Sequence, residues 1–242
     1  MPDRFLNACL GDRREATRRY LATVKWRKDD HIDGMLDSAS PRNFEVIKKY
    51  YPHYYCGRGR SGNVVYYEDC GKIDVPALAS SGVGVSDIVH HYVYITEFCF
   101  AKLKTDEDAR TISVFDVDGV GVGDLKGPVM DFIKATTKIM QDHYPERSQC
   151  ILVINAPSWF TIIWSMVKVF IDARTQAKVK ICSRADAYRT ILKVVEHDQI
   201  PEKYGGGLRV ENGRGGENNC RLWSPDEVLL REWARDHGGG EQ

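Results

Sequence analysis

The sequence predicts an α/β fold, in which a largely parallel sheet covered by helices follows a small helical lobe. Three observations lead to this prediction. Short apolar strands alternate with helix-length segments from residue 64 onward. Residues 1–55 show helical patterns and no clear strand. With 242 residues, the chain is long enough for one main domain with a small lobe, and for an enclosed cavity.

Residues 1–55 are expected to form the helical lobe. Asp12 followed by Glu15 is typical of a helix start, because the Asp side chain can cap the first free amides. Shorter helical segments are expected up to Tyr50. The apolar residues after the cap are spaced to share one helix face: Ala16, Tyr20, Leu21 and Val24.

Residues 56–208 are expected to form the sheet domain. Strands are predicted at 64–67, 111–117, 151–154 and 178–182. Apolar residues at helical spacing predict helices between these strands and after the last one, over 88–103, 125–139, about 158–171 and 185–195.

Residues 209–242 are expected to form a linker and a C-terminal helix. The chain is rich in Gly, Asn and charged residues from Gly205 to Asn219, which is typical of a linker. Ser224 and Glu227 then form a capping box around a proline at the first helical position, so a helix is expected to about Asp236.

The composition excludes some classes of protein. Lys+Arg and Asp+Glu both number 34, so no overall field draws the chain to nucleic acid, and we expect no nucleic-acid partner. The seven cysteines form no C-x-x-C pair, and several lie in apolar runs, which favours free thiols in a reducing compartment such as the cytosol. The first 14 residues are too charged for a signal peptide.

The segment from Trp159 to Ile171 is apolar on all sides except for Lys168. Its 13 residues are too few to cross a bilayer, which needs about 20. Periodicity alone favours a helix buried in the core. The other interpretation is a movable lid that meets lipid when open, which two tryptophans favour. The residues assigned to this gate and its pocket are Trp159, Phe160, Ile163, Trp164, Val167 and Phe170.

Charged and hydroxyl groups flank this apolar segment. Glu146 and Arg147 precede the strand at 151–154, and Thr175 and Lys178 follow the helix. Arg and Lys can neutralise a phosphodiester, Glu can accept hydrogen bonds from ring hydroxyls, and Thr can donate and accept. Taken alone, these residues fit solvated ion pairs at the ends of elements better than a site.

Three other signals predict ordinary structure. Gly119, Gly121 and Gly123 follow a strand but lack the third glycine of a dinucleotide fingerprint, so a loop that needs small residues is the better explanation. Asp116 and Asp118 are expected to satisfy loop amides rather than to act as catalytic carboxylates. The histidines have no partners at metal-ligand spacing: His90, His91 and His143.

The chain resembles the CRAL-TRIO lipid-binding family, specifically the secretory-type phosphatidylinositol/phosphatidylcholine transfer proteins. The resemblance extends over residues 4–207. Each matching segment is common by itself, but the segments together, in this order and spacing, are specific to the family. They are Arg4-Phe5-Leu6, Lys25-Trp26-Arg27-Lys28-Asp29, Tyr50-Tyr51-Pro52-His53-Tyr54-Tyr55, Val65-Tyr66-Tyr67-Glu68, Tyr144-Pro145-Glu146-Arg147, Ile154-Asn155-Ala156-Pro157, Phe170-Ile171-Asp172, Thr175-x-x-Lys178 and Ile200-Pro201-Glu202-Lys203-Tyr204-Gly205-Gly206.

The resemblance implies a mixed sheet under a deep apolar pocket, gated by the helix at about 158–172. It implies contacts to an inositol-lipid headgroup from Glu146, Arg147, Thr175 and Lys178. A second set, which holds the phosphate of choline lipids, falls on Thr111 and Ser113, with Tyr55 and Tyr66 nearby.

Three positions depart from the family pattern. An arginine that supports the inositol site is replaced by Cys9. The usual Asp-Gly-Arg-Pro turn is replaced by Ser61-Gly62-Asn63-Val64, and Lys-Pro in the gate by Lys168-Val169. These departures bear on headgroup preference and membrane docking.

The expected function is a monomeric, cytoplasmic carrier of phosphatidylinositol, and also of phosphatidylcholine, that touches membranes transiently. It would have no enzymatic activity, metal or cofactor; its ligand would be the phospholipid, exchanged between membranes or presented to lipid-modifying enzymes. About 30 CH₂ groups at about 0.8 kcal/mol each make exposure of two acyl tails too costly without a cavity and a lid. The alternatives are a sensor for a sterol, tocopherol-like molecule or fatty acid, and, more distantly, a Rossmann-type oxidoreductase.

Overall fold

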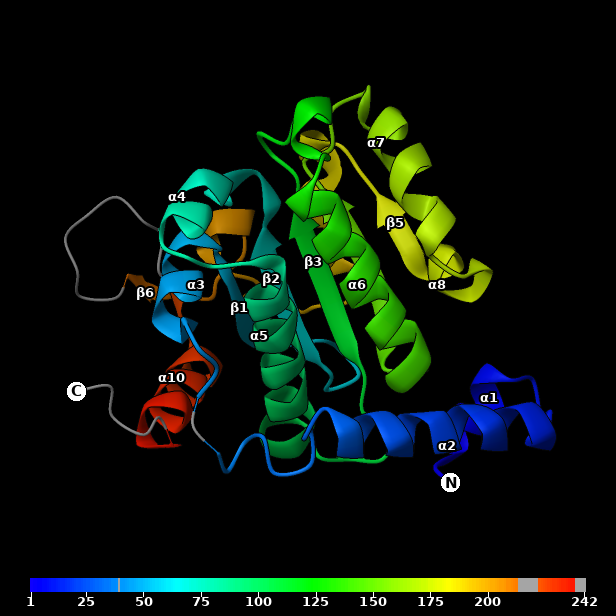
Figure 1. Cartoon of the computed structure of the whole chain (residues 1–242). Helices are drawn as coiled ribbons and strands as arrows, with labels where there is room; N and C mark the ends of the chain where they lie inside the picture. Colours follow the sequence, from blue (N-terminus) through cyan, green and yellow to red (C-terminus); the bar gives the residue numbers. More distant parts are fainter. Residues whose placement is uncertain (39, 213–221, 238–242) are drawn as a thin grey trace.

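The computed structural model describes residues 1–38, 40–212 and 222–237, and a sheet with helices on both faces forms its centre (Figure 1). The strands are β1 (His53–Arg58), β2 (Val64–Asp69), β3 (Thr111–Asp116), β4 (Ser148–Ile154), β5 (Val179–Ile181), β6 (Glu211–Asn212) and β7 (Leu222–Trp223). The α-helices are α1 (Asp3–Ala8), α2 (Arg13–Asp29), α3 (Phe44–Tyr50), α4 (Val75–Ser80), α5 (Val85–Phe98), α6 (Pro128–His143), α7 (Phe160–Val167), α8 (Ala173–Lys178), α9 (Ala187–Leu192) and α10 (Pro225–His237). The shorter helical segments are η1 (Cys70–Lys72), η2 (Cys99–Leu103), η3 (Val122–Asp124), η4 (Lys168–Phe170), η5 (Arg184–Asp186), η6 (His197–Gln199) and η7 (Glu202–Tyr204).

The main sheet is mixed, in the order β1-β2-β3-β4-β5. Strand β1 runs antiparallel to β2, and the pairs β2–β3, β3–β4 and β4–β5 are parallel. Each parallel pair is joined by a helical crossover, through α4 and α5, α6, or α7 and α8. This architecture confirms the predicted α/β class.

The two faces of the sheet are packed differently. On the face covered by α9, Ile112 and Val114 of β3 are fully buried against Leu152 and Ile191. The alternate residues of β3, beginning with Thr111, point to the face covered by α5, α6 and α7 and keep part of their surface accessible, although β3 is a central strand. Side-chain packing therefore closes the α9 face more completely than the opposite face.

The N-terminal helices lie beneath the amino ends of the parallel strands (Figure 1). The predicted cap is confirmed, since the amide of Glu15 donates to Asp12 Oδ1 at 3.0 Å. Trp26 of α2 stacks on His143 at the end of α6, with ring centroids 4.0 Å apart. Thr23 lies on the face of α2 that packs on α6, and Ala16 is also buried, whereas Leu21 and Val24 of the predicted helix face are exposed.

The prediction missed strand β1. The last helical segment ends at Tyr50 as expected, but β1 begins at His53, inside the range of 1–55 assigned to the helical lobe. The four residues from His53 to Cys56 are all buried, so both faces of the strand are covered and the sequence lacks the alternation that marks a half-buried strand. The boundary between the helical lobe and the sheet therefore lies a few residues earlier than 55/56.

The C-terminal helix α10 packs against β1 and the end of α3. Its predicted cap is confirmed, because the amide of Glu227 donates to Ser224 Oγ at 3.0 Å. Glu227 also pairs with Lys48 at 2.8 Å in a fully buried position. Burial lowers the pKa of the Lys48 ammonium to about 8, against the opposing effect of Glu227. In the predicted linker and C-terminal segment, 213–221 and 238–242 lie outside the described residues.

Two further observations concern the described part of the chain. None of its helices combines the length and the apolar character required to span a bilayer. Its six cysteines are all free thiols, and Cys220 lies outside it.

Candidate functional site

Glu146 and Lys178 meet at the amino edge of the parallel strands. Lys178 Nζ lies 3.1 Å from Glu146 Oε2 and donates to the carbonyl of Ser148 at 3.1 Å. Glu146 precedes β4 and Lys178 precedes β5, and neighbouring parallel strands begin at the same edge of a sheet. Glu146 has a φ of 59°, a left-handed conformation that is uncommon for a residue with a Cβ. Two of the predicted headgroup residues are thus brought together.

A second cation, Arg174, shares the same carboxylate. Its Nη2 lies 2.9 Å from Glu146 Oε1. Its Nη1 donates a hydrogen bond of 2.5 Å to the carbonyl of Asn7 at the end of α1. The sequence analysis did not select this residue, although Arg174 and Lys178 are four residues apart, the spacing that places two side chains on one face of a helix.

Thr175 lies on the same short helix, α8. Its hydroxyl donates to Asp172 Oδ2 at 2.7 Å, and Asp172 Oδ1 accepts from the amides of Arg174 and Thr175. Asp172 is therefore the N-cap of α8, and Thr175 is part of that cap. The acceptor lone pairs of the Thr175 hydroxyl are still available to a ligand.

Arg147 is not brought into this cluster. Its Nη1 donates to the carbonyls of Glu107 at 3.1 Å and Ala109 at 2.8 Å, and the guanidinium lies 4.3 Å from the ring centroid of Phe100. Burial lowers the pKa of this guanidinium, and the nearby charge of Arg4 acts in the same direction. In the structure, Arg147 holds the loop that leads into β3, while its neighbour Glu146 contacts Lys178.

The four residues of the second predicted set share one face of the sheet. Tyr55, Tyr66 and Ser113 are successive register partners across β1, β2 and β3, and Thr111 lies two residues before Ser113. Tyr55 donates to the carbonyl of Ile95 at 3.1 Å. Among the residues that the structure describes, none hydrogen-bonds the Ser113 hydroxyl. This row lies on the less tightly packed face.

Glu68 is a functional candidate that the sequence analysis missed. It lies two residues after Tyr66 on the same face of β2, is fully buried, and accepts a hydrogen bond from the Tyr66 hydroxyl at 2.9 Å. Burial raises the pKa of its carboxyl to about 7, although the hydrogen bond from Tyr66 acts in the opposite direction. A glutamate in a strand of apolar and aromatic residues was the available signal.

The apolar helix is exposed on one side. Phe160 and Ile163 are buried against Val153 of β4, and Trp164 and Val167 pack partly on the same cluster. The interpretation as a helix buried on all sides is wrong, because the outer face is apolar and exposed. Its members are Trp159 (39% exposed), Ile162 (52%), Met166 (38%), Val169 (68%) and Phe170 (36%).

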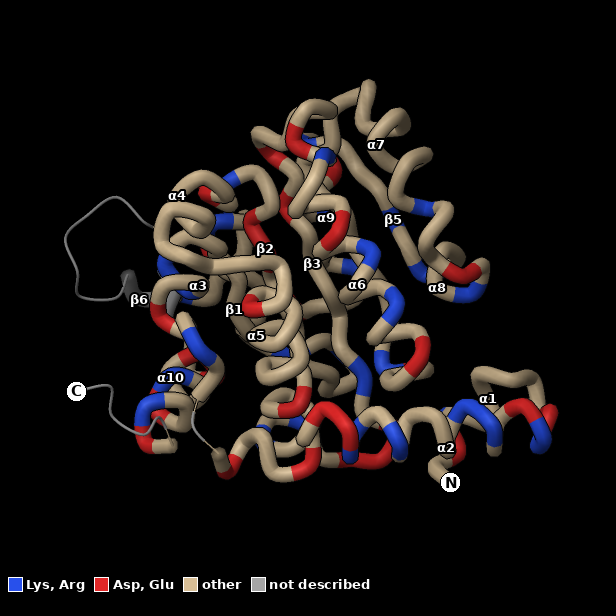
Figure 2. The backbone as a smooth tube through the Cα atoms, viewed as in Figure 1, with Lys and Arg blue, Asp and Glu red and all other residues tan. Residues whose placement is uncertain are grey.

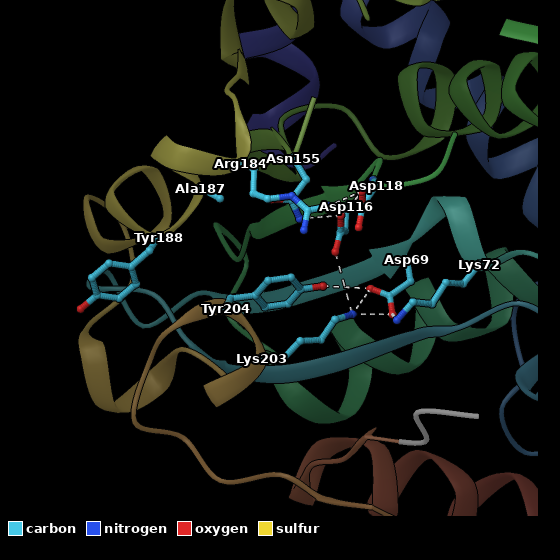
Figure 3. Close-up of a pocket in the computed structure, with 10 residues that line it drawn as sticks. All are labelled: Asp69, Lys72, Asp116, Asp118, Asn155, Arg184, Ala187, Tyr188, Lys203 and Tyr204. Atoms are coloured by element: carbon cyan, nitrogen blue, oxygen red, sulfur yellow. Dashed lines mark hydrogen bonds and ion pairs between the residues drawn. The ribbon is translucent and has the colours of Figure 1, made fainter. Parts of the chain in front are cut away.

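A polar pocket of ≈ 330 Å³ lies at the opposite, carboxyl edge of the sheet (Figure 3). Lys203 Nζ lies 2.5 Å from both carboxylate oxygens of the buried Asp69, and Tyr204 donates to Asp69 at 2.9 Å. The other cations in the pocket also have carboxylate partners, Lys72 with Asp69 and Arg184 with Asp118. The positive and negative side chains of this pocket therefore balance one another. The sequence analysis did not find the pocket, because its residues are far apart in the chain and form no local motif.

Asp116 has the role expected of it in the loop, whereas the side chain of Asp118 pairs with Arg184. Asp116 Oδ1 accepts from the amide of Asp118 at 3.1 Å and from Asn155 Nδ2 at 2.7 Å. A side chain at Gly71 would lie 1.8 Å from the carbonyl oxygen of Asp118, so this crossing of two loops requires a glycine.

One of the histidines considered in the sequence analysis lies in the core. The Nε2 atom of His91 lies 2.9 Å from Nε2 of His53.

The fold and the cluster at its amino edge define a CRAL/TRIO-type domain, and the comparisons agree. Residues 48–206 match the family described as CRAL/TRIO domain, more than half of the chain. The chain therefore belongs to this family, which confirms the resemblance inferred from its motifs. The crystal structure of Sfh5 superposes with a TM-score of 0.67 at 15% identity, over 95% of this chain and 78% of that one, and so shows the fold alone.

Curated relatives carry related names. The chain is 28% identical over 243 residues to the phosphatidylinositol/phosphatidylcholine transfer protein SFH9 of Arabidopsis thaliana, covering 96% of this chain and 41% of that protein. It is 28% identical over 216 residues to the Sec14 cytosolic factor of Schizosaccharomyces pombe, covering 87% of this chain and 75% of that protein. The chain thus spans less than half the length of the Arabidopsis relative.

Proposed function

We propose that this chain binds one phospholipid molecule and transfers it between membranes, with phosphatidylinositol and phosphatidylcholine as its ligands. One observation carries the proposal: the cluster of Glu146, Lys178 and Arg174 lies at the amino edge of a sheet whose inner face is only partly packed, beside an apolar helix with an exposed apolar face. The names of the curated relatives support the same ligands.

The acyl tails would lie between the inner face of β3 and β4 and the helices α6 and α7. Two tails contain about 30 CH₂ groups, worth about 25 kcal/mol if exposed to water, so they must pass directly from the bilayer to an apolar wall. The outer face of α7 and η4 meets the bilayer surface, and movement of this segment opens a path for the tails. The protein is then a peripheral, cytoplasmic and monomeric carrier that needs no cofactor and catalyses no reaction.

The two headgroups would use different residues. The phosphate of an inositol lipid binds Lys178, and Glu146 accepts hydrogen bonds from ring hydroxyls. The phosphate of a choline lipid accepts a hydrogen bond from the Ser113 hydroxyl, and from the Tyr66 hydroxyl when it turns away from Glu68. Arg147 would support the binding of a choline lipid indirectly, because it holds the loop before Thr111 in place.

A vesicle transfer assay tests the proposal with two lipids and two variants. Lys178→Ala removes the cation next to Glu146, and Lys180→Ala is the matched control on the exposed side of β5. Lys178→Ala should reduce phosphatidylinositol transfer about tenfold, since a charge-assisted hydrogen bond contributes about 1.5–3 kcal/mol, and phosphatidylcholine transfer much less. Lys180→Ala should transfer both lipids at the rate of the wild type.

Two results would contradict this account. Equal losses for both lipids in Lys178→Ala would refute the separate headgroup assignments. A wild-type protein that transfers neither lipid would refute the carrier function itself.

A further inference from the structure

The turn between α1 and α2 carries a leucine whose place in the fold is unfavourable. Leu10 is 86% exposed and has a φ of 53°, a left-handed conformation that costs energy for a residue with a Cβ. It follows Cys9, the C-cap of α1, at a position where glycine or asparagine is usual. Neither burial in the core nor the geometry of the turn therefore explains a leucine here.

Two arginines without partners follow this leucine. Arg13 and Arg14 form the start of α2 and are exposed. Within the part of the chain that the structure describes, neither forms a hydrogen bond or an ion pair. The first turn of a helix is the positive end of its dipole, where acidic side chains are stabilising and basic ones are not. These two cations, like the leucine, are placed against the local preference of the fold.

The nearby carboxylates do not neutralise the two arginines. Glu15 pairs with Arg18 at 2.6 Å, and Asp142, at the end of α6, pairs with Lys138 at 2.6 Å. Between residues 9 and 20 the chain holds four arginines and two carboxylates, so this segment has two positive charges in excess, although the whole chain is neutral. Figure 2 shows these basic residues along the first turns of α2. The turn is therefore a local basic surface with an apolar tip.

This turn lies beside the segment assigned to the membrane contact. Arg19 of α2 places Nη1 3.9 Å from Cys9 Sγ, and its Nη2 donates to the carbonyl of Gln141 at 2.5 Å. The side-chain amide of Gln141 in turn donates to the carbonyl of Phe170 in η4 at 2.9 Å. In Figure 1 the connection between α1 and α2 lies on the side of the molecule where α7 and α8 lie. The turn and the exposed apolar face of α7 and η4 thus share one side of the protein.

We propose that the α1–α2 turn is a second membrane contact, which docks the chain on bilayers with an anionic surface. Leu10 enters the interfacial region of the bilayer, and Arg13 and Arg14 bind lipid phosphates beside it. This inference rests on the proposed function, because it adds to the contact made by α7 and η4. One apolar side chain binds a bilayer weakly, and neighbouring cations strengthen the binding where the surface is negative. Two separate contacts also fix the orientation of the chain on the bilayer.

Co-sedimentation of the full chain with vesicles tests this contact. Vesicles of phosphatidylcholine alone are compared with vesicles that also contain phosphatidylserine, for wild type, Leu10→Asn and Arg13→Gln/Arg14→Gln. Asparagine tolerates the left-handed conformation, so Leu10→Asn removes the apolar tip without straining the turn. Thermal midpoints and vesicle-to-vesicle lipid transfer are measured for the same proteins.

Two matched controls lie elsewhere on the surface. Arg189→Gln/Lys193→Gln also removes two exposed cations, but near α9, which covers the opposite face of the sheet. Leu229→Asn removes an exposed leucine from α10. Both controls should bind each kind of vesicle as the wild type does.

The two changes in the turn should differ in their dependence on lipid charge. Arg13→Gln/Arg14→Gln should bind phosphatidylserine vesicles about 25-fold more weakly, since each cation near an anionic surface contributes about fivefold, and should bind neutral vesicles as the wild type does. Leu10→Asn should bind both kinds of vesicle about tenfold more weakly, with a thermal midpoint that is unchanged or higher.

Unchanged binding of either variant to phosphatidylserine vesicles would overturn the membrane contact. An equal loss in the arginine variant and in the α9 control would also overturn it, because net charge alone would then explain the result. A lower thermal midpoint in Leu10→Asn would give the leucine a structural role instead. A wild type that binds phosphatidylserine vesicles through Arg13 and Arg14 but transfers no lipid would support this contact and overturn the carrier function alone.

Discussion

Tyr66 and Ser113 are register partners on the parallel strands β2 and β3, and both face α5 and α6. Tyr55 continues the row on β1, with its ring centroid 5.4 Å from that of Tyr66. Three polar side chains from distant parts of the sequence thus form a line across the less tightly packed face of the sheet. The hydroxyls of Tyr55 and Tyr66 already donate to the Ile95 carbonyl and to Glu68, so in this row the Ser113 hydroxyl is the group that can donate to a phosphate lying on that face.

Replacing Ser113 tests the role of this row. Ser113→Ala should lower phosphatidylcholine transfer several-fold and leave phosphatidylinositol transfer nearly unchanged, because the proposed inositol contacts lie at the edge of the sheet. The free energy of unfolding should change by less than about 1 kcal/mol, since no described protein group hydrogen-bonds this hydroxyl. Equal effects on both lipids in the vesicle assay would argue against a specific role for the row.

Glu68 should make the stability of the protein fall as the pH rises. The folded protein keeps the Glu68 proton up to about pH 7, whereas the unfolded chain releases it near its ordinary value of 4.5. Between these values the folded state binds more protons, so the free energy of unfolding decreases with increasing pH. The full effect is about 3 kcal/mol, of which about 2 kcal/mol is lost between pH 5 and pH 8.

Urea denaturation of wild type and Glu68→Gln at these two pH values measures this effect. Gln keeps the shape and can accept from the Tyr66 hydroxyl, but it does not titrate. The stability of Glu68→Gln relative to wild type should therefore rise by about 2 kcal/mol from pH 5 to pH 8. Parallel pH profiles for the two proteins would show that Glu68 titrates normally in the folded state.

Lys203 should be important for stability. Asp69 is 2% exposed and has Lys203 Nζ 2.5 Å from each carboxylate oxygen (Figure 3). Lys203→Met leaves this buried charge with the Tyr204 hydroxyl and with Lys72, whose Nζ is 3.6 Å from Asp69 Oδ2 and half-exposed, and should cost about 3 kcal/mol by urea denaturation. The double variant Lys203→Met/Asp69→Asn should recover at least half of the loss. A single variant as stable as wild type would show that Asp69 is solvated.

The exposed face of α7 and η4 should bind membranes. Ile162→Asp and Val169→Asp each remove an exposed apolar side chain, worth about 1.5–3 kcal/mol when buried in a bilayer. Each should reduce co-sedimentation with vesicles about tenfold without changing the thermal midpoint. Leu229→Asp is the matched control, because Leu229 is similarly exposed on α10. A control that loses as much binding would point to general charge repulsion.

The elements that the sequence predicted best carry strong local signals. The cap at Asp12 and the cap at Ser224 each need only a short side chain and an amide three residues away, so they form as predicted. Strand β3 was predicted as a short strand segment between two helical patterns, and its residues alternate between buried and partly accessible positions. Strand β1 was missed because both of its faces are buried, which removes that alternation.

The candidate site depends on contacts that local patterns do not encode. Glu146 and Arg147 are adjacent, and the left-handed turn at Glu146 sends one side chain toward α8 and the other toward the loop before β3. Arg174 contacts Asn7, which is 167 residues away in the chain. Only the assembled sheet brings such residues together, so the sequence could name the segments of the site but not its pairs.

Native mass spectrometry of the intact chain, gently purified and exposed to phospholipid vesicles, tests the central claim most directly. The account predicts the mass of the protein plus one diacyl phospholipid, because the inner face of the sheet shelters both acyl tails. A protein that carries no lipid after this exposure, or that carries only a small isoprenoid or a single fatty acid, would contradict it.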